Sequence, residues 1–282
     1  SGAIIDGTTV IANSGDATLD AAQIANSTVT AETGAATLTA DAIISGNTVS
    51  ALTNASLTGD LQITGNTVNA AGQVTFAGVN DVDLVNNTVA AGTILANDAE
   101  ITDIVGGTYT SSGDTTLAAT VEIGGVTVQA QGAAILGAGA DIVNSTVEGS
   151  TAVLTAGGNI SNTAVEALTT AGLTATAGSI LDSTVTAGTD ATLGAAAGFI
   201  AGTNVTALND ATLAALIVSA SNISVGNNVT VTGDSQIVGN VINAVNTAIL
   251  AGASPVDLVN NQVAATTILA NTGIGNIIGG TY

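Results

Sequence analysis

The chain has 282 residues and a formal net charge of −21, and it contains no Lys, Arg, His, Cys, Met or Trp. Nucleic acids and anionic membrane surfaces are bound through Lys and Arg, so this composition argues against both as partners. It also excludes an imidazole base, a thiolate, an amine nucleophile and a disulfide. The sequence has no run of 18 apolar residues, so it predicts no membrane insertion.

One sequence unit returns along the whole chain, and its first clear copy is Asp16 to Val29. Its constant feature is an apolar residue followed, five positions later, by a β-branched or aromatic residue, with a period of 18 to 21 residues. A fixed period near 20 residues is the signature of a solenoid. The pairs are Ile5/Val10, Ile24/Val29, Ile44/Val49, Ile63/Val68, Leu84/Val89, Ile104/Tyr109, Ile123/Val128, Ile142/Val147, Ile160/Val165, Ile180/Val185, Ile200/Val205, Val218/Ile223, Ile237/Ile242, Leu258/Val263 and Ile277/Tyr282.

Each repeat reads as short β-strands separated by Gly, Asn, Asp or Ser. Within residues 36–40, Ala36, Leu38 and Ala40 alternate with Thr37 and Thr39, which is the period of a strand with one face inside. Small aliphatic side chains cannot fill a wide globule, but they fill a narrow tube in which every turn adds a few of them.

A sharp corner is predicted between the two members of each pair, because residues on one strand face are separated by an even number. Ile44 and Val49 are an odd number apart, and Gly46-Asn47 lies between them. Gly and Asn tolerate the left-handed backbone of such a corner. Stacked Asn side chains can bond from turn to turn. We therefore predict a structural ladder of Asn26, Asn47, Asn66, Asn87, Asn144, Asn162, Asn222, Asn240 and Asn261.

A turn of 18 to 21 residues has room for about three short strands. Crossovers between parallel strands are right-handed by default. The sequence therefore predicts an all-β protein, a single-chain right-handed parallel β-helix of about 14 to 15 rungs, with residues 1–282 forming one continuous β-solenoid.

The unit Ala-Thr-Leu-x-Ala…Ile-x-x-Asn-Thr-Val-x-Ala resembles the haemagglutinin-type repeats of filamentous-haemagglutinin-like secreted surface proteins. The resemblance covers nearly the whole chain. It implies a right-handed parallel β-helix and a place in an adhesin-like fibre at the cell surface. The secretion domain that precedes such repeats and their usual basic residues are missing from this sequence.

A longer repeat overlies the short one, because the block 1–109 returns as 175–282, with rungs 110–174 between them. Ile104-Val-Gly-Gly-Thr-Tyr109 returns as Ile277-Ile-Gly-Gly-Thr-Tyr282, and Tyr109 is followed directly by a further rung. Open strand edges favour stacking of copies in a heterologous, non-closing contact. We therefore expect the rungs of Ile5, Val10, Ile277 and Tyr282 to form a head-to-tail junction in a homopolymer.

Sites for chemistry are few. The sequence predicts no catalytic residue and no cofactor, since only paired carboxylates such as Asp81/Asp83 remain for an enzyme. Calcium needs several convergent oxygen ligands. The densest acidic group, a weak candidate for a metal site, is Asp98, Glu100 and Asp103.

Two further features of the sequence concern the protein surface. Sequons for N-glycosylation occur at Asn54, Asn159, Asn204 and Asn228, and also at the ladder candidates Asn26, Asn144 and Asn222. Threonine rows such as Thr18, Thr37, Ser56 and Thr75 resemble the outward face of an ice-binding solenoid, although ordinary β-propensity also explains them.

The sequence thus favours a structural protein, outside the cell or at its surface, with its signal peptide removed. It would be the subunit of an extracellular filament or surface coat that self-assembles through its terminal rungs. The alternatives are an adhesin stalk or passenger module and an ice- or calcium-binding solenoid. Its main expected partner is itself, with divalent cations and surface glycans as the other partners considered.

Overall fold

The computed structural model describes residues 2–270 and 273–282. In these residues the protein is all-β, with 67% strand and no helix, and its parallel strands stack as the turns of a β-solenoid, about 14 in all. This confirms the predicted fold class. The turns divide into two compact units, unit 1 (Ser1–Gly139 and Ser145–Gly149) and unit 2 (Ala140–Asn144 and Ser150–Tyr282). The continuity of one solenoid over residues 1–282 stays a prediction.

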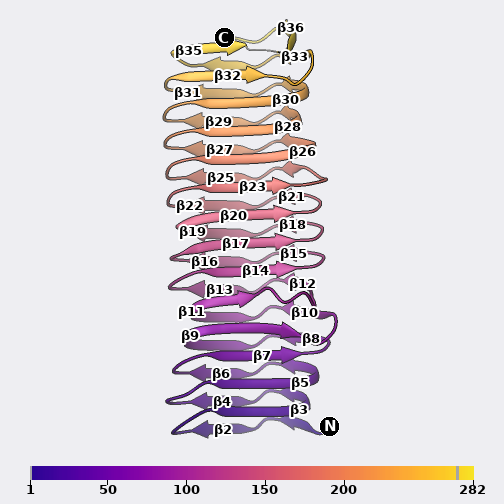
Figure 1. The fold of residues 1–282 in the computed structure, drawn as a ribbon, viewed down its shortest axis with the longest axis vertical. Helices are drawn as coiled ribbons and strands as arrows, with labels where there is room; N and C mark the ends of the chain where they lie inside the picture. Colours follow the sequence, from indigo (N-terminus) through magenta and orange to yellow (C-terminus); the bar gives the residue numbers. More distant parts are fainter. Residues whose placement is uncertain (1, 271–272) are drawn as a thin grey trace. The chain divides into compact units, whose positions relative to one another are not determined.

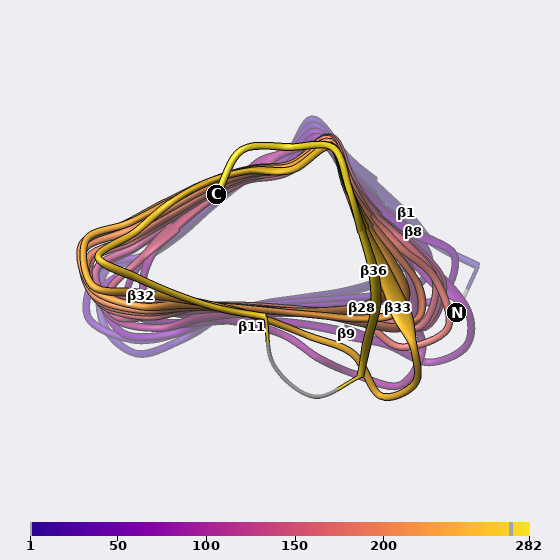
Figure 2. The same ribbon diagram turned by 90° about the horizontal axis from the view of Figure 1, so that it is seen from above.

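Each turn has three sides, which Figure 2 shows from above. The isoleucine side holds the first member of each sequence pair, the valine side holds the second, and the leucine side follows after a loop. β1 (Ile4–Asp6), β2 (Thr9–Ala12) and the first half of β3 (Ala17–Ala25) form the three sides in order. Within each unit the nearer strands in Figure 1 run from left to right as the chain climbs, which is a right-handed coil.

The strands are short, as the close spacing of turn residues requires. In unit 1 the remaining strands are β4 (Thr28–Ala31), β5 (Ala36–Ser45), β6 (Thr48–Ala51), β7 (Ala55–Gly59), β8 (Gln62–Thr64), β9 (Thr67–Gly78), β10 (Val82–Val85), β11 (Thr88–Ala96), β12 (Ile101–Val105), β13 (Thr108–Ser111), β14 (Thr115–Ala119), β15 (Ile123–Gly124), β16 (Thr127–Ala130), β17 (Ala133–Ala138) and β19 (Thr146–Gly149). In unit 2 they are β18 (Ile142–Val143), β20 (Thr151–Ala156), β21 (Ile160–Ser161), β22 (Ala164–Ala167), β23 (Ala171–Ala175), β24 (Ile180–Leu181), β25 (Thr184–Ala187), β26 (Ala191–Ala201), β27 (Asn204–Ala207), β28 (Ala211–Ser219), β29 (Asn222–Val225), β30 (Val229–Val238), β31 (Val241–Ala244), β32 (Thr247–Ala251), β33 (Val256–Val259), β34 (Gln262–Ala264), β35 (Thr267–Ala270) and β36 (Ile274–Ile278).

The core is a set of buried columns, one for each side of the turn, because like residues pair in register. In unit 1 the isoleucine-side column is Ile24, Ile44, Ile63, Leu84, Ile104 and Ile123, all fully buried. Unit 2 repeats it with Ile142, Ile160, Ile180, Ile200, Val218, Ile237 and Leu258. Each such side chain contributes roughly 1.5–3 kcal/mol on burial.

The corner between the isoleucine and valine sides uses two residues of different character. The first has a positive φ, which explains the many glycines there, and its non-glycine occupants have φ between 48° and 52°. These occupants are Asn26, Asn86, Asn144, Asn162, Asp182, Ala220 and Asn260. The second corner residue points into the tube. In the described residues, no helix is long and apolar enough to cross a membrane.

Candidate functional site

The inner corner position of unit 1 holds three stacked asparagines, Asn47, Asn66 and Asn87, each at most 1% exposed. The Nδ2 atom of Asn47 lies 3.0 Å from Oδ1 of Asn66, and Nδ2 of Asn66 lies 3.0 Å from Oδ1 of Asn87. Each amide also donates to the carbonyl oxygen of an isoleucine in the preceding turn, as Asn66 does to Ile44 at 3.0 Å. The Oδ1 atoms of Asn66 and Asn87 therefore each accept two bonds, one from a side chain and one from a main-chain N–H, whereas Oδ1 of Asn47 accepts the main-chain N–H of Ser27.

Unit 2 contains the same arrangement over fewer turns. Nδ2 of Asn240 lies 3.1 Å from Oδ1 of Asn261 and 2.9 Å from the carbonyl oxygen of Val218. The main-chain N of Ser221 donates to Oδ1 of Asn240 at 3.0 Å. Serine also occupies this inner position at Ser27, whose main-chain N donates to Oδ1 of Asn47 at 2.9 Å. Short polar side chains thus take the same place as asparagine.

The remaining predicted ladder residues lie elsewhere, so the single ladder expected from the sequence was wrong for them. Asn26, Asn144 and Asn162 occupy the first corner position, where a positive φ turns the side chain outward. Asn222 begins β29, exposed and in register with Asn204 on the valine side. The sequence did contain the distinguishing signal. An inward Asn precedes the valine-side residue by two positions, whereas an outward corner Asn precedes it by three.

The ladder of unit 1 ends at Tyr109. Gly107 takes the inner position of that turn, and a Cβ there would lie 3.3 Å from the Tyr109 ring, so the ring fills the space of the absent side chain. Tyr109 is fully buried, and its hydroxyl has no hydrogen-bond partner among the described residues. Burial raises the pKa of Tyr109, and the nearby side chain of Asn87, which does not form a hydrogen bond of normal geometry with the hydroxyl, acts more weakly in the lowering direction.

The weak metal candidates Asp98, Glu100 and Asp103 do not converge. Oδ1 of Asp98 accepts the main-chain N–H of Glu100 at 3.1 Å, whereas Asp103 accepts that of Glu122 at 2.9 Å. These bonds point the carboxylates at different parts of the chain. In the part of the chain that the structure describes, no group of three or more acidic side chains is placed to hold a metal ion.

Asp83 is an acidic residue whose pKa is changed by its surroundings. Burial raises the pKa of the Asp83 carboxyl, and the carboxylates of Asp103 and Asp81 act in the same direction, against a hydrogen bond from the Asp103 main chain. The register of β10 and β12 places Leu84 beside Ile104, so Asp83 and Asp103 stack on the isoleucine side.

Side-chain and main-chain amide groups donate hydrogen bonds to carboxylates in this protein, which has no Lys or Arg to form ion pairs with them. Oδ1 of Asp210 accepts from Nδ2 of Asn227 at 2.9 Å, and from the main-chain N and Nδ2 of Asn228 at 2.9 and 3.1 Å. This satisfies a half-buried carboxylate without an ion pair.

The four glycosylation candidates differ in availability. Nδ2 of Asn228 is bonded to Asp210, while the side-chain oxygens of Asn54 and Asn159 accept main-chain N–H groups of Gln73 and Ser179. Asn204 is exposed at the start of β27. Glycosylation itself stays a prediction.

The predicted threonine row on the leucine side is interrupted, because Thr75 pairs with Leu95 in the next turn. An uninterrupted row lies instead on the valine side of unit 1, at the position just before each valine-side core residue. We call it the threonine file. It consists of Thr9, Thr28, Thr48, Thr67, Thr88, Thr108, Thr127 and Thr146, paired in register from turn to turn. The sequence signal, a Thr directly before the second pair member, was present but overlooked.

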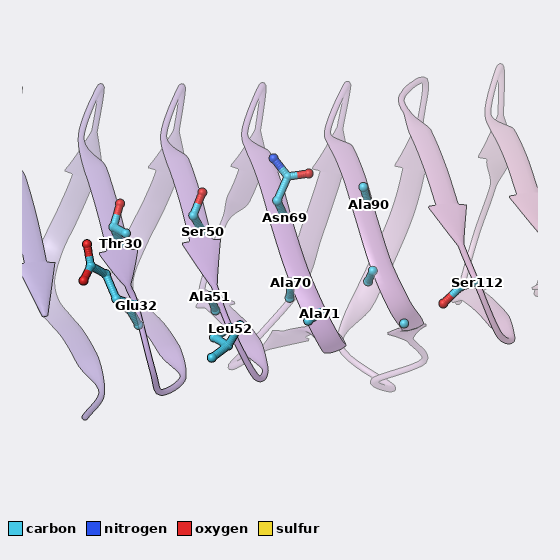
Figure 3. Close-up of a pocket in the computed structure, with 13 residues that line it drawn as sticks. Thr30, Glu32, Ser50, Ala51, Leu52, Asn69, Ala70, Ala71, Ala90 and Ser112 are labelled. Carbon is cyan, nitrogen blue, oxygen red and sulfur yellow. The ribbon is translucent and has the colours of Figure 1, made fainter. Parts of the chain in front are cut away.

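A shallow groove of about 580 Å³ runs beside this file at the edge of the valine side. Figure 3 shows Thr30, Ser50, Asn69 and Ala90 standing in a row along it, one from each of four successive turns. Its floor is made of small residues such as Ala51 and Ala70. Unit 2 has a counterpart lined by Ser224, Asn243 and Ala264.

The predicted junction residues lie on turns whose neighbours are all on one side. Ile5 pairs with Ile24 and Val10 with Val29, while Ile277 pairs with Leu258. Ile277 is 55% exposed and Tyr282 43% exposed, whereas their equivalents Ile104 and Tyr109 are fully buried.

Comparison of the chain with protein families, with curated proteins and with solved structures found no match. Any functional assignment therefore depends on the geometry described above. That geometry offers, within each unit, turns that stack in register, and in unit 1 one ordered outer file of threonines.

Proposed function

We propose that this protein is structural: a β-solenoid subunit of an extracellular filament or surface coat whose copies stack head to tail. The observation that carries the proposal is the turn-to-turn contact itself. Successive turns pair along their strand edges and stack buried apolar residues, and many add a buried polar group at the corner, so one turn is a suitable surface for another. The resemblance to haemagglutinin-type repeats of secreted surface proteins supports the same role.

The internal joint above Tyr109 supplies a template for contact between copies. There, Ile104 pairs with Ile123, Thr108 with Thr127 and Tyr109 with Val128. Residues 277–282 repeat 104–109 almost unchanged, and Ile5, Gly7, Thr9 and Val10 match Ile123, Gly125, Thr127 and Val128. On the isoleucine and valine sides, the template therefore places Ile277 under Ile5 and Tyr282 under Val10 of the next copy.

Electron microscopy of the purified 282-residue chain tests the proposal. We expect filaments with an axial repeat equal to the length of one chain. Ile277→Asp should prevent them, because it places a charge where an aliphatic column continues. Val153→Asp is the control, since Val153 is a 43% exposed strand residue away from the joint. Uniform short particles of the unmodified chain, at all concentrations and salt conditions, would contradict head-to-tail assembly.

Cysteine cross-linking tests the register. Adjacent parallel strands lie about 4.8 Å apart, within the Cα separation that a disulfide spans. The chain has no cysteine of its own. Under oxidation, Thr9→Cys/Thr281→Cys should give covalent ladders on non-reducing gels, and Ile11→Cys/Thr281→Cys, two residues out of register, should not. Thr108→Cys/Thr127→Cys closes an internal pair and is the positive control. Filaments without covalent ladders would leave assembly standing and reject this register.

A further inference from the structure

Outward positions on a solenoid are free to vary, because they do not pack in the core. The second outward row of the same valine-side strands does vary, running from Ile11 through Asn69 and Ala90 to Glu148. The threonine file does not vary over its eight turns. β-Propensity explains why Thr is acceptable at such positions, but it does not explain why every turn of one row, and of no other outward row, has it.

The file is also available to a ligand. Thr28, Thr48, Thr67 and Thr88 are exposed. Within the described part of the chain, no hydroxyl of the file makes a hydrogen bond, so each presents a free donor and acceptor beside a methyl group. None of the eight carries charge, in a chain with a net charge of −21.

The support behind the file is rigid. Each central threonine directly follows an inner-ladder residue and directly precedes a buried valine, as in Asn66-Thr67-Val68. The ladder bonds fix the corner from turn to turn, and the main-chain N of Thr67 donates to the carbonyl oxygen of Asn47 at 2.8 Å. The spacing of the threonines is therefore the strand spacing of about 4.8 Å, held constant along the file.

A rigid, uncharged row of hydroxyl and methyl groups with one fixed repeat fits a partner with a similar repeat. Ice is such a partner, because the oxygen repeat along its a axis is close to the strand spacing of about 4.8 Å. Beside the central part of the file, the second row offers short side chains at Thr30, Ser50, Asn69, Ala90 and Thr110, which leave the surface unobstructed. We propose that the threonine file, with this adjoining row, is an ice-binding surface.

Unit 2 provides a comparison within the same chain. Its equivalent row reads Ala164, Thr184, Asn204, Asn222, Val241 and Gln262. Four of these positions, Asn204, Asn222, Val241 and Gln262, replace Thr28, Thr48, Thr67 and Thr88 of the duplicated block. The proposal therefore assigns the activity to unit 1 alone, and it does not depend on assembly.

Thermal hysteresis and the shape of ice crystals grown in the protein's presence test the proposal. We expect the unmodified chain to lower the freezing point below the melting point and to facet the crystals. Thr67→Tyr/Thr88→Tyr, which raises two large side chains above the file, should lose both effects. The matched control is Thr192→Tyr/Thr212→Tyr, two exposed threonines on adjacent turns of the leucine side of unit 2, and it should keep them.

The outcomes separate cleanly. Absence of hysteresis and faceting in the unmodified chain overturns the proposal, as does equal activity in the two tyrosine variants. Thermal melting followed by circular dichroism reports whether the variants fold. If Thr67→Tyr/Thr88→Tyr lowers the melting temperature, the variant Thr67→Ser/Thr88→Ser is used in its place to test whether the threonine file binds ice. It keeps the hydroxyls and removes the methyls, and retention of full activity by this variant would also overturn the proposal.

Discussion

The Nδ2 atom of Asn66 lies 3.0 Å from Oδ1 of Asn87, and the main-chain N of Asn66 lies 3.1 Å from the same oxygen. One amide oxygen thus satisfies two donors of the preceding turn, in a place that is closed to water. The ladder joins turns through side chains in addition to the main-chain pairing of the strands. Its removal should therefore be costly, although it holds no reactive group.

Asn66→Ala should lower the free energy of unfolding by about 1–3 kcal/mol, because it leaves the main-chain N of Asn47 buried without a partner and removes the side-chain bond to the carbonyl oxygen of Ile44. Asn66→Ser should cost less, since serine serves at Ser27. The control is Asn69→Ala, an exposed residue of the same repeat, with an expected change within about 0.5 kcal/mol. Urea unfolding measures all three. Equal effects of Ala at both positions would contradict the ladder's role.

The repeat in the sequence predicts most of the fold. Pairs such as Ile44/Val49 predict the buried columns because one pair recurs in every turn. The buried positions of the narrow core accept few side chains other than apolar ones. The position of each Asn was harder, because Asn suits both corner positions for different reasons: a positive φ at Asn26 and inward bonding at Asn47. The acidic candidates failed for another reason, since loop side chains such as Asp98 follow local bonds that no period encodes.

Tyr109 should control the response to alkali. Its folded pKa is raised, so the folded state holds the proton more firmly, and stability present below the unfolded pKa of about 10 is lost as pH rises above it. The sequence has only two tyrosines, Tyr109 and Tyr282, and no Lys or Cys. Tyr109→Phe should abolish most of the alkaline loss and, by removing an unpartnered hydroxyl, add about 1 kcal/mol at neutral pH. Tyr282→Phe is the control, and an unchanged alkaline midpoint in Tyr109→Phe would refute the assignment.

Asp83 should make the protein more stable as pH falls. Its pKa is raised above 3.8 in the folded state, so the folded state binds the proton more readily, and a penalty present at neutral pH is relieved as pH falls through the folded pKa. Asp83→Asn should therefore stabilise the chain at pH 7, and this advantage should shrink as pH falls through the folded pKa and be lost below the ordinary value of 3.8. Asp20→Asn, at an exposed outward position of β3, removes the same formal charge as a control. The urea midpoint against pH gives the comparison. A constant advantage of Asp83→Asn at every pH would show that burial of this carboxylate is not the cause.

The first corner position should tolerate alanine in some turns and not in others. Gly65 and Gly106 both have a positive φ, 62° and 64°, so either substitution incurs the left-handed strain of about 1 kcal/mol. A Cβ at Gly65 meets only the main-chain N of Gly46 at 4.0 Å, whereas a Cβ at Gly106 would overlap Oδ1 of Asn86. Gly106→Ala should therefore cost more than Gly65→Ala, and Asn86→Gly should recover the difference but not the strain. Gly137→Ala, with open space and no positive φ, is the neutral control. If Gly65→Ala and Gly106→Ala shift the thermal midpoint equally, the contact with Asn86 does not limit this corner, and backbone strain alone sets its preference for glycine.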